Sequence, residues 1–260
     1  IVSDGRLHLG IGWGYQHLGF RGMGLDIAER QERFQEGLDV LLDAWTGDQL
    51  NHEGKYYTFA ADANVLPKPQ QTPHPPIWFA VTSDETIRYV AKTNFRVFGS
   101  ARWANNGEKA GADYSLYLSE RRAAGLNDDL WTYALNRQCY VIPKSANWQQ
   151  EKNEFEDRSR YTMRLARGLR NDNANYDRGW LTADPLPVED DTDTLFERLI
   201  FGTPDEVAER ILQLNSEIAI DLLMLQGDFG GLSPAKSERS QELFGTEVIP
   251  LIRKELGLDS

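Results

Sequence analysis

The chain has 260 residues, a mass of 29.6 kDa and 40% hydrophobic residues, enough to bury a sizeable core. Its net charge of −12 argues against nucleic acid or an anionic membrane as a main partner, and no apolar run approaches the roughly 20 residues that span a bilayer. Its single cysteine, Cys139, excludes an intramolecular disulfide and a cysteine-rich metal site, and fits a cytoplasmic protein.

The first part of the chain is predicted to form one strand, one helix and a hairpin. A strand is expected at residues 6–12, followed by a glycine-rich loop through Gly24. A helix is expected to begin at Asp26, whose spacing to Glu29 matches a capping box. Residues 46–59 are typical of a turn and a small hairpin, and the prolines of "LPKPQQTPHPP" then require an extended connection.

Strands and helices alternate through the rest of the chain. The apolar segment "IWFAV" (77–81) is typical of a strand buried on both faces, and a helix follows it at once. Further strands are expected at 95–100, 135–143 and 221–231, and helices at 107–124, 146–170, from Thr203 (with Glu206 completing a capping box) and at 235–255. Five strands in this pattern predict parallel β/α units, in an open sheet or in part of an eight-stranded barrel.

The segment "RLHLGIGWGYQ" (6–16) carries Gly10, Gly12 and Gly14 at alternate positions. A dinucleotide loop needs G-x-G-x-x-G and an immediate helix, and neither is present here. Two interpretations remain open. The glycines permit a tight bend or close packing at a strand end, or they flatten the end of a barrel strand for a planar ligand.

A second candidate is the turn "TSDET" (82–86). Ser83 and Thr86 lie at the start of a helix directly after a buried strand, where free N–H groups and the helix dipole attract an anion. The alternative is plain helix capping, because Thr82 and Glu85 match a capping box.

An ordered series of motifs runs through nearly the whole chain: "DGRLHLGIGWGYQ", "ERQERF", "LLDAWTGD", "HEGKYYTF", "PKPQQTPHPPIWFAVTSDET" and "GTPDEVAERI…DLLMLQGDFGG". In this series the chain resembles the bacterial luciferase-like, flavin-dependent monooxygenases. The resemblance implies a (β/α)8 barrel, with residues 1–260 as a single domain that holds its fourth to eighth units. It also implies that the first three strands are missing from this sequence, which opens without a methionine.

The resemblance also implies a flavin site at the carboxyl ends of the strands. The FMN phosphate would lie at Ser83 and Thr86, with Val81 and Thr82 adjoining, and the ring would lie near Gly12, Trp13, Gly14 and Tyr15. The chain departs from the family at two positions. Trp13 stands where the luciferases carry an arginine that reaches the phosphate, and Phe34 stands where the alkane branch has a tyrosine.

The activity implied is that of a two-component monooxygenase without a metal. Reduced FMN from a separate NAD(P)H-dependent reductase would react with O2, and the resulting C4a-peroxyflavin would oxygenate a small, apolar organic substrate. A homodimer is expected by the same resemblance. The alternatives are a deazaflavin-dependent oxidoreductase on the same barrel and a non-catalytic flavin-binding protein.

The remaining polar residues receive weaker predictions. His17 is a candidate catalytic donor to a flavin carbonyl or a peroxide oxygen, and the arginines of "RSRYTMRLARGLR" are expected on a solvated helix face. Gln226 and Asp228 are expected at the floor of the pocket, and residues 171–195 as a mobile lid. The other predictions place His8 outside the barrel, His52 and His74 in structural or exposed positions, and Cys139 in the core.

Overall fold

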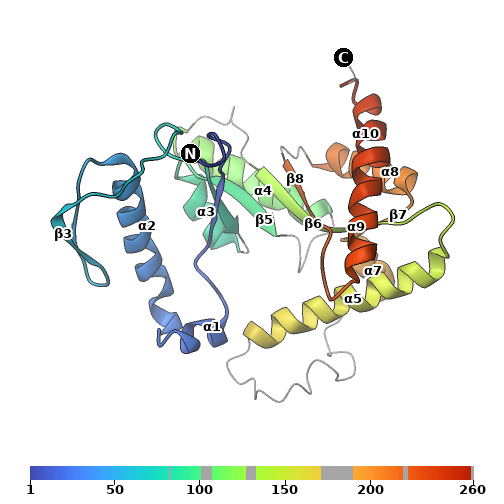
Figure 1. Cartoon of the computed structure of the whole chain (residues 1–260), viewed down its shortest axis with the longest axis horizontal. Coiled ribbons are helices and arrows are strands. Elements are labelled where there is room, and N and C mark those ends of the chain that lie inside the picture. The colour runs from blue at the N-terminus through green and yellow to red at the C-terminus, as the bar shows by residue number, and fades with distance from the viewer. Residues whose placement is uncertain (82, 101–106, 127–132, 171–189, 219–221, 259–260) are drawn as a thin grey trace. The chain divides into compact units, whose positions relative to one another are not determined.

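A computed structural model describes residues 1–81, 83–100, 107–126, 133–170, 190–218 and 222–258 (Figure 1). Contacts divide the chain into two compact units. Unit 1 comprises Ile1–Ala80 with Leu169–Asn173, and unit 2 comprises Val81–Gly168 with Ala174–Ser260. That residues 1–260 form a single domain stays a prediction.

Unit 1 begins with a shorter strand than predicted and contains a helix that was not predicted. Its elements are β1 (Leu9–Ile11), α1 (His17–Gly22), the 3₁₀ turn η1 (Ile27–Glu29), α2 (Arg30–Thr46), β2 (Leu50–Glu53), β3 (Thr58–Ala63) and, except for its last residue, β4 (Ile77–Val81). The predicted hairpin and the predicted strand 77–81 are confirmed. Helix α1 occupies part of the segment expected as a loop.

The capping box predicted at Asp26 is wrong. Asp26 caps η1, and its side chain accepts a hydrogen bond from the Ala28 N–H at 2.9 Å. The Glu29 N–H donates to the Asp26 carbonyl instead, and the Glu29 carboxylate pairs with Arg33 at 2.8 Å. The tight turn therefore comes first, and the α-helix begins only at Arg30.

Strands β1 and β4 pair in parallel, with Leu9, Gly10 and Ile11 opposite Ile77, Trp78 and Phe79. Because side chains alternate across a strand, Ile11 and Phe79 share one face. Phe34 of α2 packs edge-on against Phe79 at 5.2 Å between ring centroids, so α2 covers this face. The opposite face carries His8, Gly10, Gly12, Trp78 and Ala80, and is called the glycine face below.

The hairpin of unit 1 is held to α2 through one carboxylate. Strands β2 and β3 are antiparallel, and the tip between them includes Tyr56 and Tyr57. Glu36 of α2 accepts hydrogen bonds from the backbone N–H groups of both tyrosines, at 3.0 Å and 2.7 Å. His52 of β2 contacts the same carboxylate at 3.2 Å, so its predicted structural position is confirmed. His74, which stacks on Trp45 at 6.0 Å, is likewise structural.

Unit 2 alternates helices and strands along the chain. Its elements are α3 (Asp84–Ala91), β5 (Arg96–Ser100), α4 (Gly107–Ala123), β6 (Tyr133–Val141), α5 (Trp148–Arg170), α7 (Thr192–Phe196), β7 (Ile200–Gly202), α8 (Pro204–Glu217), β8 (Leu222–Gln226), α9 (Pro234–Leu243), the π-helical segment η2 (Phe244–Val248) and α10 (Ile249–Glu255). Strand β6 pairs in parallel with β5, β7 and β8. This is the arrangement of part of a (β/α)8 barrel, as predicted.

Several elements of unit 2 differ from the sequence prediction, including α7, which lies at the end of the segment expected as a lid. Strand β7 was missed because it has only three residues. Strand β8 ends at Gln226, before two glycines with positive φ, Gly230 and Gly231. The single helix predicted at 235–255 is divided by the π-helical segment, since Pro250 at the start of α10 has no N–H to continue the ladder.

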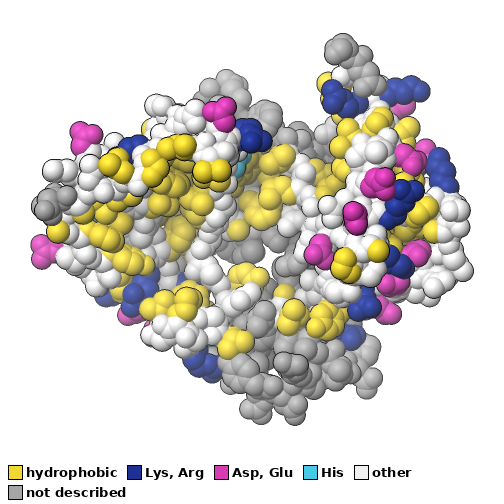
Figure 2. Space-filling model, viewed as in Figure 1, with side chains coloured by type: hydrophobic (Ala, Val, Ile, Leu, Met, Phe, Trp, Pro, Cys, Tyr) yellow, Lys and Arg dark blue, Asp and Glu magenta, His cyan; other side chains and the backbone are white. Residues whose placement is uncertain are grey.

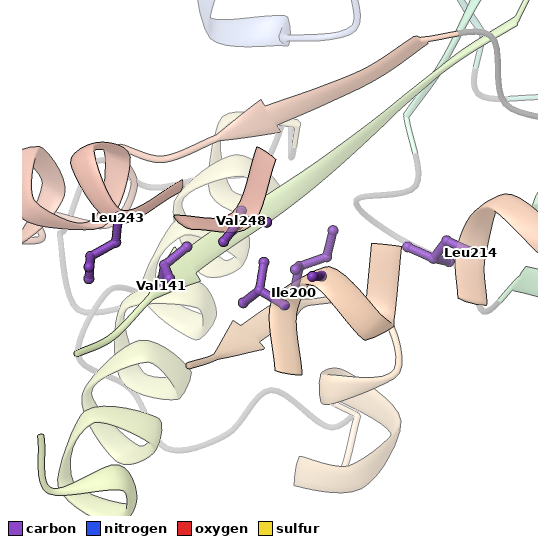
Figure 3. Close-up of a cluster of buried hydrophobic side chains, with 8 residues drawn as sticks. Val141, Ile200, Leu214, Leu243 and Val248 are labelled. Atoms are coloured by element: carbon purple, nitrogen blue, oxygen red, sulfur yellow. The ribbon is translucent and has the colours of Figure 1, made fainter. Parts of the chain in front are cut away.

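A core of aliphatic side chains holds the outer helices of unit 2 to the sheet. Val141 and Ile200 come from paired strands, and Leu214, Leu243 and Val248 reach them from the helices (Figure 3). Cys139 lies in this cluster at 4% exposure, and burial raises the pKa of its thiol to about 12, so its predicted core position is confirmed. Acidic and basic side chains are interspersed over α9 and α10 at the surface (Figure 2).

Candidate functional site

The turn after β4 brings together two hydroxyl groups at the start of α3. Ser83 is the N-cap residue, and its Oγ accepts a hydrogen bond from the Thr86 N–H at 3.3 Å. The two hydroxyl oxygens lie 2.9 Å apart. The capping residue is thus Ser83, and the alternative capping box of Thr82 with Glu85 is wrong; Thr82 itself lies outside the described residues.

This turn has the donors that a phosphate needs. One hydroxyl donates to the other, which leaves one of the two hydroxyl protons for a further acceptor. The first N–H groups of a helix have no partner within it, and the helix dipole favours an anion there. Asp84 and Glu85 are exposed in the same turn, and their charges oppose an anion. These donors therefore fit a phosphate, but the two carboxylates weaken the electrostatic attraction between the turn and the anion.

The end of β1 offers a flat surface on the glycine face. A Cβ built on Gly10 would meet no atom within 4 Å, and one built on Gly12 would meet only the Ala80 Cβ at 3.5 Å. Helix α2 covers the opposite face of these strands, so the flat surface lies on the face that α2 leaves uncovered. The second interpretation of the glycines, room for a planar ligand, fits this arrangement.

The residues after β1 lie in different environments. The Trp13 ring packs edge-on against Phe79 at 5.9 Å, the same ring that Phe34 contacts. Tyr15 is 39% exposed, and His17 is the half-buried first residue of α1. The roles predicted for Gly12, Trp13, Gly14, Tyr15, His17, Val81, Thr82, Ser83 and Thr86 stay predictions.

The predicted position of His8 outside the barrel is wrong. The Trp78 indole N–H donates to His8 Nδ1 at 2.9 Å, and the two rings stack with their centroids 6.0 Å apart. Trp78 belongs to the glycine face, so His8 lies on the side away from α2. The face that His8 occupies depends on the register in which β1 pairs with β4, and the local sequence does not reveal that register.

Unit 2 contains a small cavity, lined by polar and apolar side chains, that the sequence analysis missed in part. Gln138 of β6 lies opposite Gln226 of β8, and both line a cavity of about 20 Å³. Its lining residues are Asn136, Arg137, Gln138, Met163, Leu195, Arg198, Leu199 and Gln226. Burial lowers the pKa of Arg137 to about 10, helped by the charge of Arg210. Three consecutive polar residues in an otherwise apolar strand were the signal that could have revealed it.

The other pocket predictions have mixed outcomes. Gln226 lines this cavity and Asp228 lines a different surface pocket, and their position at the floor of the flavin pocket stays a prediction. Arg160 pairs with Glu156 one helical turn away at 2.8 Å, so the expected charge balance is present, but both side chains are largely buried and the expected solvated face is wrong for this pair. Most of the expected lid, residues 171–189, lies outside the described part of the chain.

The described residues show neither a metal site nor a membrane-spanning helix. No group of three or more His, Cys, Asp or Glu side chains is arranged there to hold a metal ion. None of the helices described is both long enough and apolar enough to cross a membrane.

Comparison with known proteins gives relatives along the whole chain. An uncharacterized protein y4vJ of Sinorhizobium fredii is 28% identical over 99% of this chain and 72% of its own. The FMNH(2)-dependent dimethylsulfone monooxygenase of Pseudomonas putida is 26% identical over 97% of this chain and 67% of its own. The F420-dependent glucose-6-phosphate dehydrogenase of Microbacterium testaceum is 24% identical over 98% of this chain and 71% of its own.

The fold of this chain is also similar to those of solved structures. The monooxygenase RslO1 from Streptomyces bottropensis matches 96% of this chain and 70% of its own with a TM-score of 0.75 and 23% identity. This likeness supports the barrel fold. A family model described as luciferase-like monooxygenase matches residues 1–221. The chain therefore belongs to the luciferase-like monooxygenase family.

Proposed function

We propose that this protein is the oxygenase component of a two-component monooxygenase that uses reduced FMN and O2 to oxygenate a small, apolar organic substrate. A separate NAD(P)H-dependent reductase supplies the reduced flavin, and the enzyme is a cytoplasmic homodimer. The family and the FMNH(2)-dependent relative support the cofactor.

The observation that carries the proposal is the pair of hydroxyls at the start of α3. The hydroxyl oxygens of Ser83 and Thr86 lie 2.9 Å apart at the start of α3, and the first turn of this helix contains no basic residue. Neutral donors at a helix N-terminus are suited to a phosphate group. We assign the FMN phosphate to this turn.

The flavin ring is assigned to the end of β1. The missing side chains of Gly10 and Gly12 let a flat ring approach the strand, and Tyr15 is exposed nearby in the sequence. Reduced FMN supplies the electrons for oxygen activation when it is bound. The protein's part is to hold the phosphate, orient the ring and, through His17, donate a hydrogen bond to a flavin carbonyl.

A second candidate is a deazaflavin-dependent oxidoreductase. The observation in its favour is the F420-dependent dehydrogenase that matches nearly the whole chain at an identity close to that of the FMNH(2)-dependent enzyme. Both cofactors carry a phosphate, so the α3 turn does not distinguish between the two candidate functions. The reactions do distinguish them, because only the FMN enzyme consumes O2.

The phosphate assignment is tested by changing both hydroxyls. A Ser83→Ala, Thr86→Ala variant is expected to bind FMN at least about tenfold more weakly, since a hydrogen bond to a charged group contributes about 1.5–3 kcal/mol. Binding is measured by flavin fluorescence. Ser233→Ala is the matched control, because Ser233 caps α9 in the same way and lies in another helix. Unchanged FMN affinity in the double variant overturns the assignment.

The cofactor is tested by supplying FMN and F420 in separate assays. A flavin reductase with NAD(P)H and FMN consumes O2 by itself, because free reduced FMN reacts with O2 to give H2O2. Adding this protein with an apolar organic substrate is therefore expected to lower the H2O2 formed per NAD(P)H consumed, and no NAD(P)H is expected to be consumed when the reductase is omitted. Substrate-dependent reduction of oxidised F420, or oxidation of reduced F420 by an organic substrate, in the absence of O2 would replace the monooxygenase proposal with the second candidate.

A further inference from the structure

Two helices of unit 2 border a long groove that the proposed flavin site does not use. Helices α8 and α10 pack together, and a groove of about 590 Å³ lies between them. Its lining on α8 runs from Asp205 in the first turn to Ser216 in the last. At 1.5 Å per residue this stretch is about 16 Å long, the length of three turns of a helix.

The groove has an apolar floor and an exposed rim. Ala208 is 4% exposed, and Leu212 and Leu251 are half-buried beside it. The charged residues of the lining are exposed. An apolar strip of this length, bordered by polar side chains, has the form that accepts the apolar face of an amphipathic helix.

The charge of the rim restricts the partner. All charged residues of the lining are acidic: Asp205, Glu209 and Glu255. Asp205 pairs with Lys144, whereas neither Glu209 nor Glu255 has an ion-pair partner among the residues that the structure describes. An acidic partner segment would be repelled by these carboxylates, so the rim favours a basic one.

We propose that this groove is a docking site for a basic amphipathic helix of a partner protein. Leucine-like side chains of that helix cover Ala208, Leu212 and Leu251, and its lysines or arginines lie against Glu209 and Glu255. The acidic rim selects the partner and speeds the encounter, while the apolar floor provides the affinity. The inference stands independently of the cofactor.

The proposal is tested with a synthetic peptide. The probe is a fluorescein-labelled peptide of about 14 leucine and lysine residues, with leucine at i, i+3, i+4 and i+7, long enough to fill the groove. A peptide of the same composition, scrambled so that the leucines form no stripe, is the comparison. Fluorescence anisotropy is expected to show saturable binding of the first peptide and at least about tenfold weaker binding of the second.

Charge-reversal variants locate the binding site. Glu209→Lys with Glu255→Lys is expected to weaken binding at least about tenfold, and Leu212→Asp likewise. Glu53→Lys with Glu238→Lys is the matched control, because it makes the same change in net charge at exposed residues outside the groove. Thermal unfolding checks that the variants remain folded. Equal weakening by the control pair, equal binding of the scrambled peptide or no saturable binding overturns the proposal.

Discussion

Gly230 lies so close to the backbone of Arg158 that a side chain at this position has no room. A Cβ built on Gly230 would lie 2.2 Å from the Arg158 carbonyl oxygen and 2.7 Å from its carbonyl carbon. Gly230 also has a φ of +58°, which side chains disfavour. The glycines of "QGDFGG" therefore let the loop after β8 pack against α5.

Substituting this glycine is expected to destabilise the protein. Gly230→Ala adds a backbone clash to the strain of positive φ, and we expect a loss of about 2–5 kcal/mol in the free energy of unfolding. Gly231→Ala is the matched control: its φ is +74°, but the nearest atom is 3.8 Å away. We expect it to lose only about 1–2 kcal/mol. Urea unfolding measures both, and equal losses would contradict the clash.

The hairpin of unit 1 is expected to loosen in acid. Burial raises the pKa of Glu36, but hydrogen bonds from the Tyr57 and Tyr56 N–H groups outweigh it, so the pKa lies below the usual 4.5. A carboxyl group whose pKa is lowered in the folded state stabilises that state at pH values above 4.5. This stabilisation is lost as the pH falls through the lowered pKa. The amide NMR shifts of both tyrosines follow the change.

The Glu36→Ala variant should show the same loosening at neutral pH. We expect faster amide exchange at Tyr56 and Tyr57, because their acceptor is gone. Glu53→Ala, an exposed carboxylate on the same hairpin, should leave both amides unchanged. A titration midpoint at or above 4.5, or unchanged protection in Glu36→Ala, would disprove the carboxylate's role.

The proposed ring site is expected to be sensitive to bulk at Gly12. Gly12→Leu should project a side chain over the glycine face and weaken FMN binding by about tenfold or more, with little change in stability. Gly12→Ala is the control, because its Cβ makes only an ordinary contact of 3.5 Å with Ala80. Fluorescence titration compares the two. If Gly12→Leu binds FMN as the unaltered protein does, the ring lies elsewhere.

Features with a strong local cause could be predicted from the sequence. The segment 77–81 is apolar at every position, and it forms the predicted strand with four of its five residues buried. The Thr203 capping box is also confirmed, with the Thr203 N–H donating to Glu206 Oε2 at 2.7 Å. In both cases the residues that decide the structure are neighbours in the chain.

Features that depend on pairing or packing could not be predicted locally. Ser83 and Thr82 are both good capping residues, and in the folded chain Ser83 is the residue that caps α3. Strand β7 is too short for a pattern and exists because Cys139–Val141 of β6 pair with it.

The sequence by itself determined the order of β/α units, the family and the two motifs that became the candidate site, because these depend on spacing along one segment. Only the tertiary structure decided which face His8 occupies, that the open sides of Gly10 and Gly12 lie away from α2, and that α8 and α10 form an acidic groove. Each of these requires side chains from segments far apart in the chain, and the register and packing that bring them together are long-range properties.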